Sequence, residues 1–188
     1  MNISPDEAQQ ALDAIQEIAR KTRRALSSSG AYLFLIVWGA IWLVGFLGNQ
    51  FLPPRSIGYL WFGLDVIGAL LSWFIVARMK RYIRNAGGVP GRRLAWFWAL
   101  LFLYVIALIG VTWPLDVRQV SAVIVLVVML GQLAMGVLLT ITSVPLTLSI
   151  TALTLVAYFI FPAYFHFIMA FLGGGGMIAA GFYIRNRW

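Results

Sequence analysis

One carboxylate inside an apolar stretch is the first candidate for chemistry in this sequence. Asp65 lies in a run of 23 residues from Ile57 to Met79, which continues into a basic block. As a helix this run would be about 34 Å long, enough to cross the ~30 Å hydrocarbon core of a bilayer. An ionised aspartate at the centre of a membrane helix costs about 2.5–3.5 kcal/mol, so such groups are paired or mark ion paths. Asp65 is therefore either a cation or proton site or a hydrogen-bonded contact between helices.

Depth in the membrane ranks the side chains that could pair with Asp65. This residue lies eight positions from the start of its run, or about 12 Å along a helix. Gln132 lies fifteen positions from Val117, or about 22 Å along its own helix, so its depth does not match. The polar residues at closer depth are Asn49, Gln50, Thr112 and Arg118.

Hydroxyl groups form a second candidate site. Thr147, Thr151, Thr154 and Tyr158 follow one another at intervals of four, three and four residues, which places them on one face of a helix. Such a stripe could line a path for water or ions. The alternative is that the hydroxyls bond to backbone carbonyls one turn back or to a neighbouring helix.

A run of glycines forms the third candidate. It consists of Gly173, Gly174, Gly175 and Gly176, in the middle of the last apolar stretch. Each glycine costs a helix about 1 kcal/mol, so four together predict either a helix break or very close packing against another helix. Broken helices in the membrane are where many transporters bind substrate.

Catalytic patterns are absent from the sequence. The chain has one histidine, His166, and no cysteine, so it cannot build a multi-histidine or thiolate metal site. It contains neither a Gly-x-Ser-x-Gly nucleophile elbow nor a phosphate-binding Gly-Lys-Ser/Thr loop. We expect no enzyme, no cofactor and no metal.

The composition requires lipid as the solvent for most of the chain. Of its 188 residues 62% are hydrophobic and only 11% are charged, against about 45–50% and about 25% in soluble domains. The net charge of +8 does not indicate nucleic-acid binding, because the basic residues stand at the ends of apolar runs.

These runs predict an all-α, polytopic integral membrane protein, a bundle of six transmembrane helices. The expected spans are 31–52, 57–79, 94–113, 117–139, 144–161 and 163–184, within a transmembrane domain of residues 30–188. The boundary between the fourth and fifth spans is the least marked. Residues 1–29 form a separate amphipathic helix, which begins with the capping sequence Ser4-Pro5-Asp6-Glu7.

The basic residues set the orientation. With six spans, twelve of the fourteen lysines and arginines lie on one side, which the positive-inside rule assigns to the cytoplasm. Both termini would then be cytoplasmic, and the protein would lie in the cell (inner) membrane. The basic residues between the second and third spans could also bind anionic phospholipid headgroups: Arg78, Lys80, Arg81, Arg84, Arg92 and Arg93.

Two functional hypotheses stay open. In the first, a small permease or channel, possibly a homo-oligomer, handles a small solute, cation or proton through Asp65, the hydroxyl stripe and the glycines. In the second, a membrane anchor or sensor recruits a cytoplasmic protein partner through residues 5–27, whose apolar positions recur at helical spacing.

Overall fold

The computed structural model describes residues 31–83, 91–139 and 144–187, and every element in these ranges is helical. The main helices are α2 (Ala31–Phe51), α3 (Pro54–Ile83), α4 (Gly91–Thr112), α5 (Val117–Leu139) and α6 (Val144–Phe159). The chain continues through η1 (Pro162–Tyr164), α7 (Phe165–Ile168) and η2 (Met169–Gly174) into α8 (Gly175–Arg187). The predicted all-α fold is confirmed. The amphipathic helix over residues 1–29 and the turn at residues 140–143 lie outside the described residues.

Helix length and hydropathy identify a multi-pass membrane protein. Within the described ranges, five helical segments are long and apolar enough to cross a bilayer: Tyr32–Phe51, Pro54–Arg78, Arg92–Thr112, Val117–Leu138 and Pro162–Asn186. Helix α6 is also apolar but has only 16 residues, or about 24 Å of helix.

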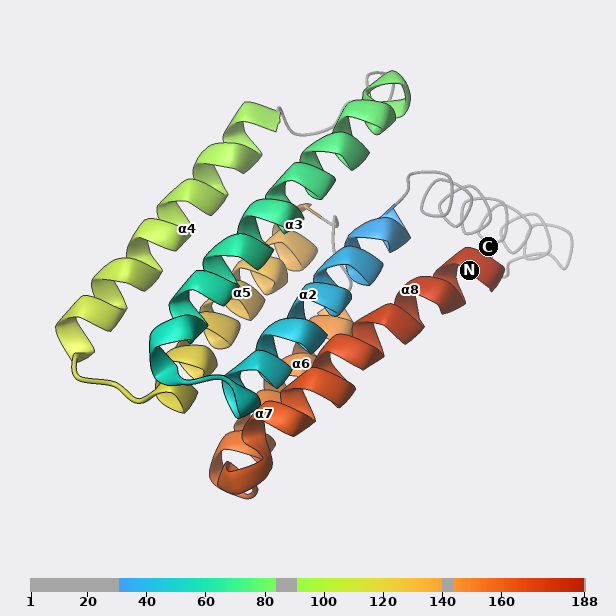
Figure 1. The fold of residues 1–188 in the computed structure, drawn as a ribbon. Helices are drawn as coiled ribbons and strands as arrows, with labels where there is room; N and C mark the ends of the chain where they lie inside the picture. Colours follow the sequence, from blue (N-terminus) through green and yellow to red (C-terminus); the bar gives the residue numbers. More distant parts are fainter. Residues whose placement is uncertain (1–30, 84–90, 140–143, 188) are drawn as a thin grey trace, which may run out of the picture.

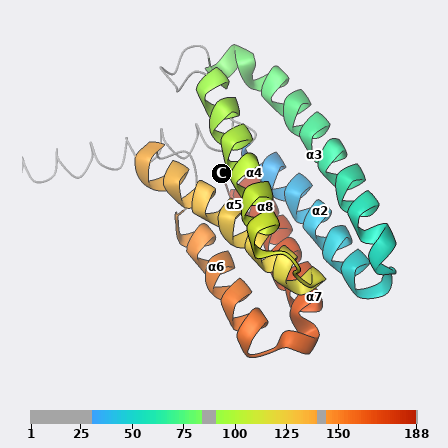
Figure 2. The ribbon, with the colours of Figure 1, turned by 90° about the vertical axis from the view of Figure 1, so that its left-hand side faces the viewer.

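The helices run alternately up and down, so that two ends of the bundle can be distinguished (Figure 1). At one end, called here the Asn49 end, α2 and α6 finish and α3 and α5 begin. At the other end, called the basic end, α3 and α8 finish and α4 begins. Helix α2 has α8 and η2 on one side and α3 on the other, and α5 packs on α6. Helices α3 and α4 are peripheral: α3 packs mainly on α2, and α4 mainly on α5 (Figure 2).

The second span begins earlier than the hydropathy predicts. Helix α3 starts at Pro54, three residues before the expected start at Ile57. Proline is favoured in the first turn of a helix, because its missing N–H has no partner there in any case. The helix also continues to Ile83, beyond the expected end at Met79, so that part of the basic block is helical.

The predicted last span is composite. A short 3-10 turn and the single turn of α7 lead into a π-helical segment, and only from Gly175 is the chain regular α-helix again. This segment packs into the core, where Phe46 of α2 meets Phe165 and Met169, all three nearly or completely buried. The backbone remains helical through the glycine run.

Candidate functional site

Asp65 lies on an exposed flank of α3. About 100° of rotation separates successive residues of an α-helix, so Asp65 is about 40° from Trp61 and about 20° from Ser72. Leu60, which lies against Gly48 of α2, is about 140° away around the helix. Asp65 therefore shares the flank of α3 that carries Trp61 and Ser72, and its side chain is exposed in the single chain.

On the side of Asp65 toward the Asn49 end, a hydrogen-bonded group joins three helices. The Trp61 indole N–H donates to Asn49 Oδ1 at 2.8 Å, and Asn49 Nδ2 donates to Ser121 Oγ at 3.1 Å. Asn49 and Ser121 are buried, with 9% and 8% of their surface exposed. Because Ser121 belongs to α5, this group shows that the Trp61 flank of α3 faces the junction with α2 and α5.

On the side of Asp65 toward the basic end lies a second polar pair. The Trp38 indole N–H of α2 donates to Ser72 Oγ at 3.2 Å. Ser72 lies eleven residues after Trp61, or about 16 Å along α3. Gln132 lies eleven residues after Ser121 on α5, so it is at about the depth of Ser72 and on the same face of α5 as Ser121.

Asp65 sits between these two polar levels. It is about 6 Å along α3 from Trp61 and about 10 Å from Ser72. Within the described ranges, no hydrogen bond or ion pair reaches its carboxylate. The amide of Asn49, one of its expected partners, is bonded to Trp61 and Ser121 instead.

The hydroxyl stripe of α6 points elsewhere. Thr151 and Thr154 donate to the carbonyls of Thr147 and Ile150, one turn back, at 2.9 and 2.8 Å. Thr154 also approaches the sulfur of Met169 at 3.7 Å, inside the core. Helix α6 packs on α5, η1, α7 and η2, and α3 packs mainly on α2, so the structure does not bring the stripe together with Asp65.

The glycine run divides into two halves. A Cβ atom at Gly174 would lie 2.6 Å from the backbone nitrogen of Leu43 and 2.7 Å from the carbonyl oxygen of Gly39. Gly173 is also buried, beside Trp42 and Met169. A Cβ atom at Gly175 or Gly176 would meet nothing within 4 Å. The first half therefore lets η2 approach the backbone of α2, and the second half does not.

The basic candidates stand at the basic end of the bundle. Arg78 lies over the ring of Phe74, with 4.8 Å between its guanidinium carbon and the ring centre, and Arg92 and Arg93 are exposed at the start of α4. Lys80 and Arg81 belong to α3, but their side chains, like the whole of Arg84, lie outside the described residues.

Sequence reasoning named Asn49 but missed the other groups at the two polar levels. Trp61, Asp65 and Ser72 stand at intervals of four and seven residues, which places them on one face of a helix, and this pattern could have been found. The pairing of Trp61 with Asn49 and Ser121 could not, because it depends on how three helices cross. No cluster of three or more histidine, cysteine or acidic side chains that could hold a metal occurs in the described ranges. Comparisons with known protein families, curated proteins and solved structures find no match for this chain.

Proposed function

We propose that this protein is a permease- or channel-like membrane protein, and that a small cation or a proton passes along the junction of α2, α3 and α5. Asp65 is the binding group. One observation carries the proposal: a carboxylate in the middle of a membrane-spanning helix lies between two hydrogen-bonded polar levels, yet has no partner of its own within the described residues.

The alternative role for Asp65 is to hold two helices together. A carboxylate that served only to hold two helices together would be expected to accept hydrogen bonds from a neighbouring helix. The nearest polar groups toward the Asn49 end, Trp61 and Asn49, are bonded to each other. Toward the basic end, Trp38 is bonded to Ser72. A residue retained at a cost of about 2.5–3.5 kcal/mol without an internal partner fits a site that meets its partner in transit.

The topology proposed with this function has six crossings and cytoplasmic termini. Of the arginines whose side chains the structure describes, two lie at the Asn49 end, in α3 and α5, and four at the basic end; the four are Arg78, Arg92, Arg93 and Arg185. The basic end also carries the ends of α2 and α8 that lead to the two termini (Figure 1). The positive-inside rule then assigns the basic end to the cytoplasm.

Flux through purified protein in liposomes tests the proposal. Proton flux is followed with an internal pH dye, and K⁺ and Na⁺ flux with ion-selective electrodes, under an imposed gradient. The wild type should conduct at least one of the three. Asp65→Asn keeps the size of the side chain and should lose at least tenfold of the flux, whereas Asp65→Glu keeps the charge and should retain a large part of it.

Thermal unfolding of the same variants separates transport from a structural role. We expect the melting temperature of Asp65→Asn to equal or exceed that of the wild type, because an unpaired carboxylate no longer has to be accommodated. If the wild type conducts none of the three cations, the proposal is wrong. It is also wrong if Asp65→Asn conducts like the wild type.

A further inference from the structure

A ring of side-chain contacts links α2, α3, α5, α6 and α7 at the Asn49 end. The guanidinium carbon of Arg118 lies 5.1 Å from the centre of the Tyr158 ring, which packs edge-on against Phe165 at 6.1 Å. Phe165 packs against His166 at 5.2 Å, and His166 stacks on Phe46 at 6.2 Å.

The ring closes through the hydrogen-bonded group already described. Phe46 meets the Trp61 ring at 5.4 Å, and Trp61 is bonded through Asn49 to Ser121. Ser121 lies three residues after Arg118 on α5, which places the two on neighbouring positions of one helix face. Arg118 and His166 thus belong to one cluster of contacting side chains.

Two nitrogen atoms in this ring are buried without a hydrogen-bond partner among the described residues: Arg118 Nε and His166 Nδ1. Burying a polar N–H without a partner costs about 1–3 kcal/mol, and native structures contain few such groups. The two atoms come from α5 and α7, which are far apart in the sequence. Because side-chain contacts link the two residues, one external group could meet both atoms.

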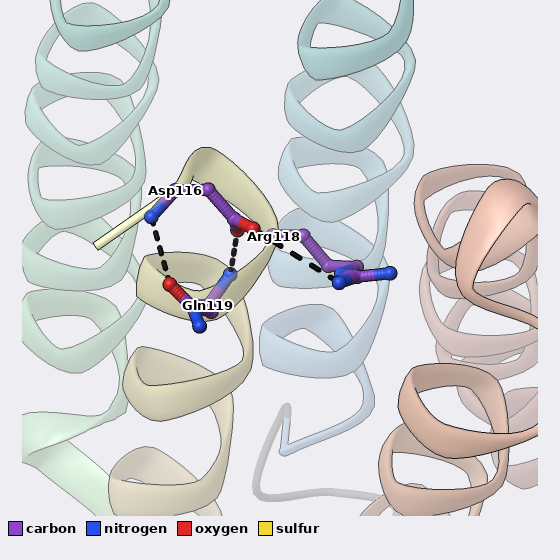
Figure 3. Close-up of polar contacts among 3 residues, drawn as sticks. All are labelled: Asp116, Arg118 and Gln119. Atoms are coloured by element: carbon purple, nitrogen blue, oxygen red, sulfur yellow. Dashed lines mark hydrogen bonds and ion pairs between the residues drawn. The ribbon is translucent and has the colours of Figure 1, made fainter.

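Asp116 forms only a long ion pair with Arg118 and leaves the Nε–H of Arg118 without a partner in the described part of the chain. Its carboxylate caps α5: Oδ1 accepts from the backbone N–H of Gln119 at 2.7 Å, and the backbone N–H of Asp116 donates to Gln119 Oε1 at 2.9 Å (Figure 3). The other oxygen, Oδ2, is 3.9 Å from Arg118 Nη2, too far for a hydrogen bond. The Arg118 side chain extends away from this cap (Figure 3), and 32% of its surface is exposed, so a ligand could reach it.

We propose that Arg118 and His166 form a binding site for a single oxyanion group, a phosphate or a carboxylate. The Arg118 Nε–H must meet an acceptor, and guanidinium groups match the oxygens of phosphates and carboxylates. His166 would donate to the same group through an Nδ1–H. This site is separate from Asp65 and does not depend on the proposed transport.

Phosphate-dependent thermal unfolding tests the site. The protein in detergent is unfolded while its tryptophan fluorescence is recorded, with sodium phosphate replacing sodium chloride at constant ionic strength. We expect the melting temperature of the wild type to rise with phosphate by a few degrees. Arg118→Gln and His166→Gln should need at least tenfold more phosphate for the same rise. Arg55→Gln, which removes an exposed arginine at the same end, should respond like the wild type.

Phospholipid phosphorus that remains after detergent exchange identifies the source of the oxyanion. If the wild type retains a phospholipid that Arg118→Gln loses, the group is a lipid headgroup. If the wild type retains none but responds to phosphate, the group is a soluble anion. Should Arg118→Gln fail to fold, Arg118→Lys keeps the charge without Nε and should show a weakened response. The proposal is overturned if the wild type neither responds to phosphate nor retains lipid, or if the Arg118 and His166 variants respond as the wild type does.

Discussion

Alanine at two glycines of the same run, Gly174 and Gly176, should have opposite effects on stability. At Gly174 a methyl group would lie 2.6 Å and 2.7 Å from backbone atoms of α2, which cannot rotate away as a flexible side chain could. Since ordinary contact requires more than 3 Å, η2 and α2 would have to separate by several tenths of an ångström. Forcing extra atoms into a packed core costs about 1–3 kcal/mol. Gly174→Ala should therefore be destabilised by about that amount.

Gly176→Ala is the matched control, two residues further along the same run. A methyl group there meets nothing within 4 Å, and the position is exposed in regular α-helix. Alanine is favoured over glycine in a helix by about 1 kcal/mol, so this variant should be slightly more stable than the wild type. The two variants should then differ by about 2–4 kcal/mol in the free energy of unfolding.

Melting temperatures of the purified proteins in detergent measure this difference. At roughly 2–4 °C per kcal/mol for a chain of this size, the two variants should be separated by on the order of 5–10 °C. Because the chain has no cysteine, tryptophan fluorescence is a better probe than a thiol-reactive dye. If both alanines shift the melting temperature equally and in the same direction, the assignment of close packing to the first half of the run is refuted.

Two further predictions concern the Asn49 group and the topology. Asn49→Ala should lower the free energy of unfolding by about 1–3 kcal/mol, because it leaves the Trp61 indole N–H buried without an acceptor; Asn186→Ala, at an exposed position on α8, should change it by less than about 0.5 kcal/mol. The pair is followed by thermal unfolding, and equal losses would contradict the role given to Asn49. Reporter tags at the two termini should both be accessible only from the cytoplasm, and a result from opposite sides would exclude the six-crossing topology.

Hydropathy was sufficient to predict the helical fold because each apolar run is long and bounded by charges, proline or glycine. It does not place α3 at its true start, because hydropathy excludes Pro54 from the apolar run although proline suits the first turn of a helix. It also did not predict the π-helical turn before Gly175, which depends on how the chain packs against α2.

The sequence singled out Asp65 and Asn49, but it did not predict how the helices assemble around them. Depth along the helices predicts that Gln132 lies nearer the basic end than Asp65 does. The arrangement of α3 and α5 is consistent with this difference in depth. Depth did not reveal that Thr154 of α6 faces Met169 of η2, because a helical stripe gives a direction only once the neighbours are known. The same limit applies to the glycines: the sequence does not show that Gly174 is the one whose backbone lies against the backbone of α2.

The contrast between Asn49 and Asp65 makes the transport proposal specific. Both are polar residues inside apolar helices, and both lie at the junction of α2 and α3. Asn49 is buried and bonded on both sides of its amide, as expected for a group that holds helices together. Asp65 carries the more costly group, lies one turn deeper than Trp61, and is left exposed. If lipid faced that flank permanently, a neutral asparagine would be less costly to bury than the carboxylate. The presence of a carboxylate therefore argues for a partner that binds Asp65 transiently.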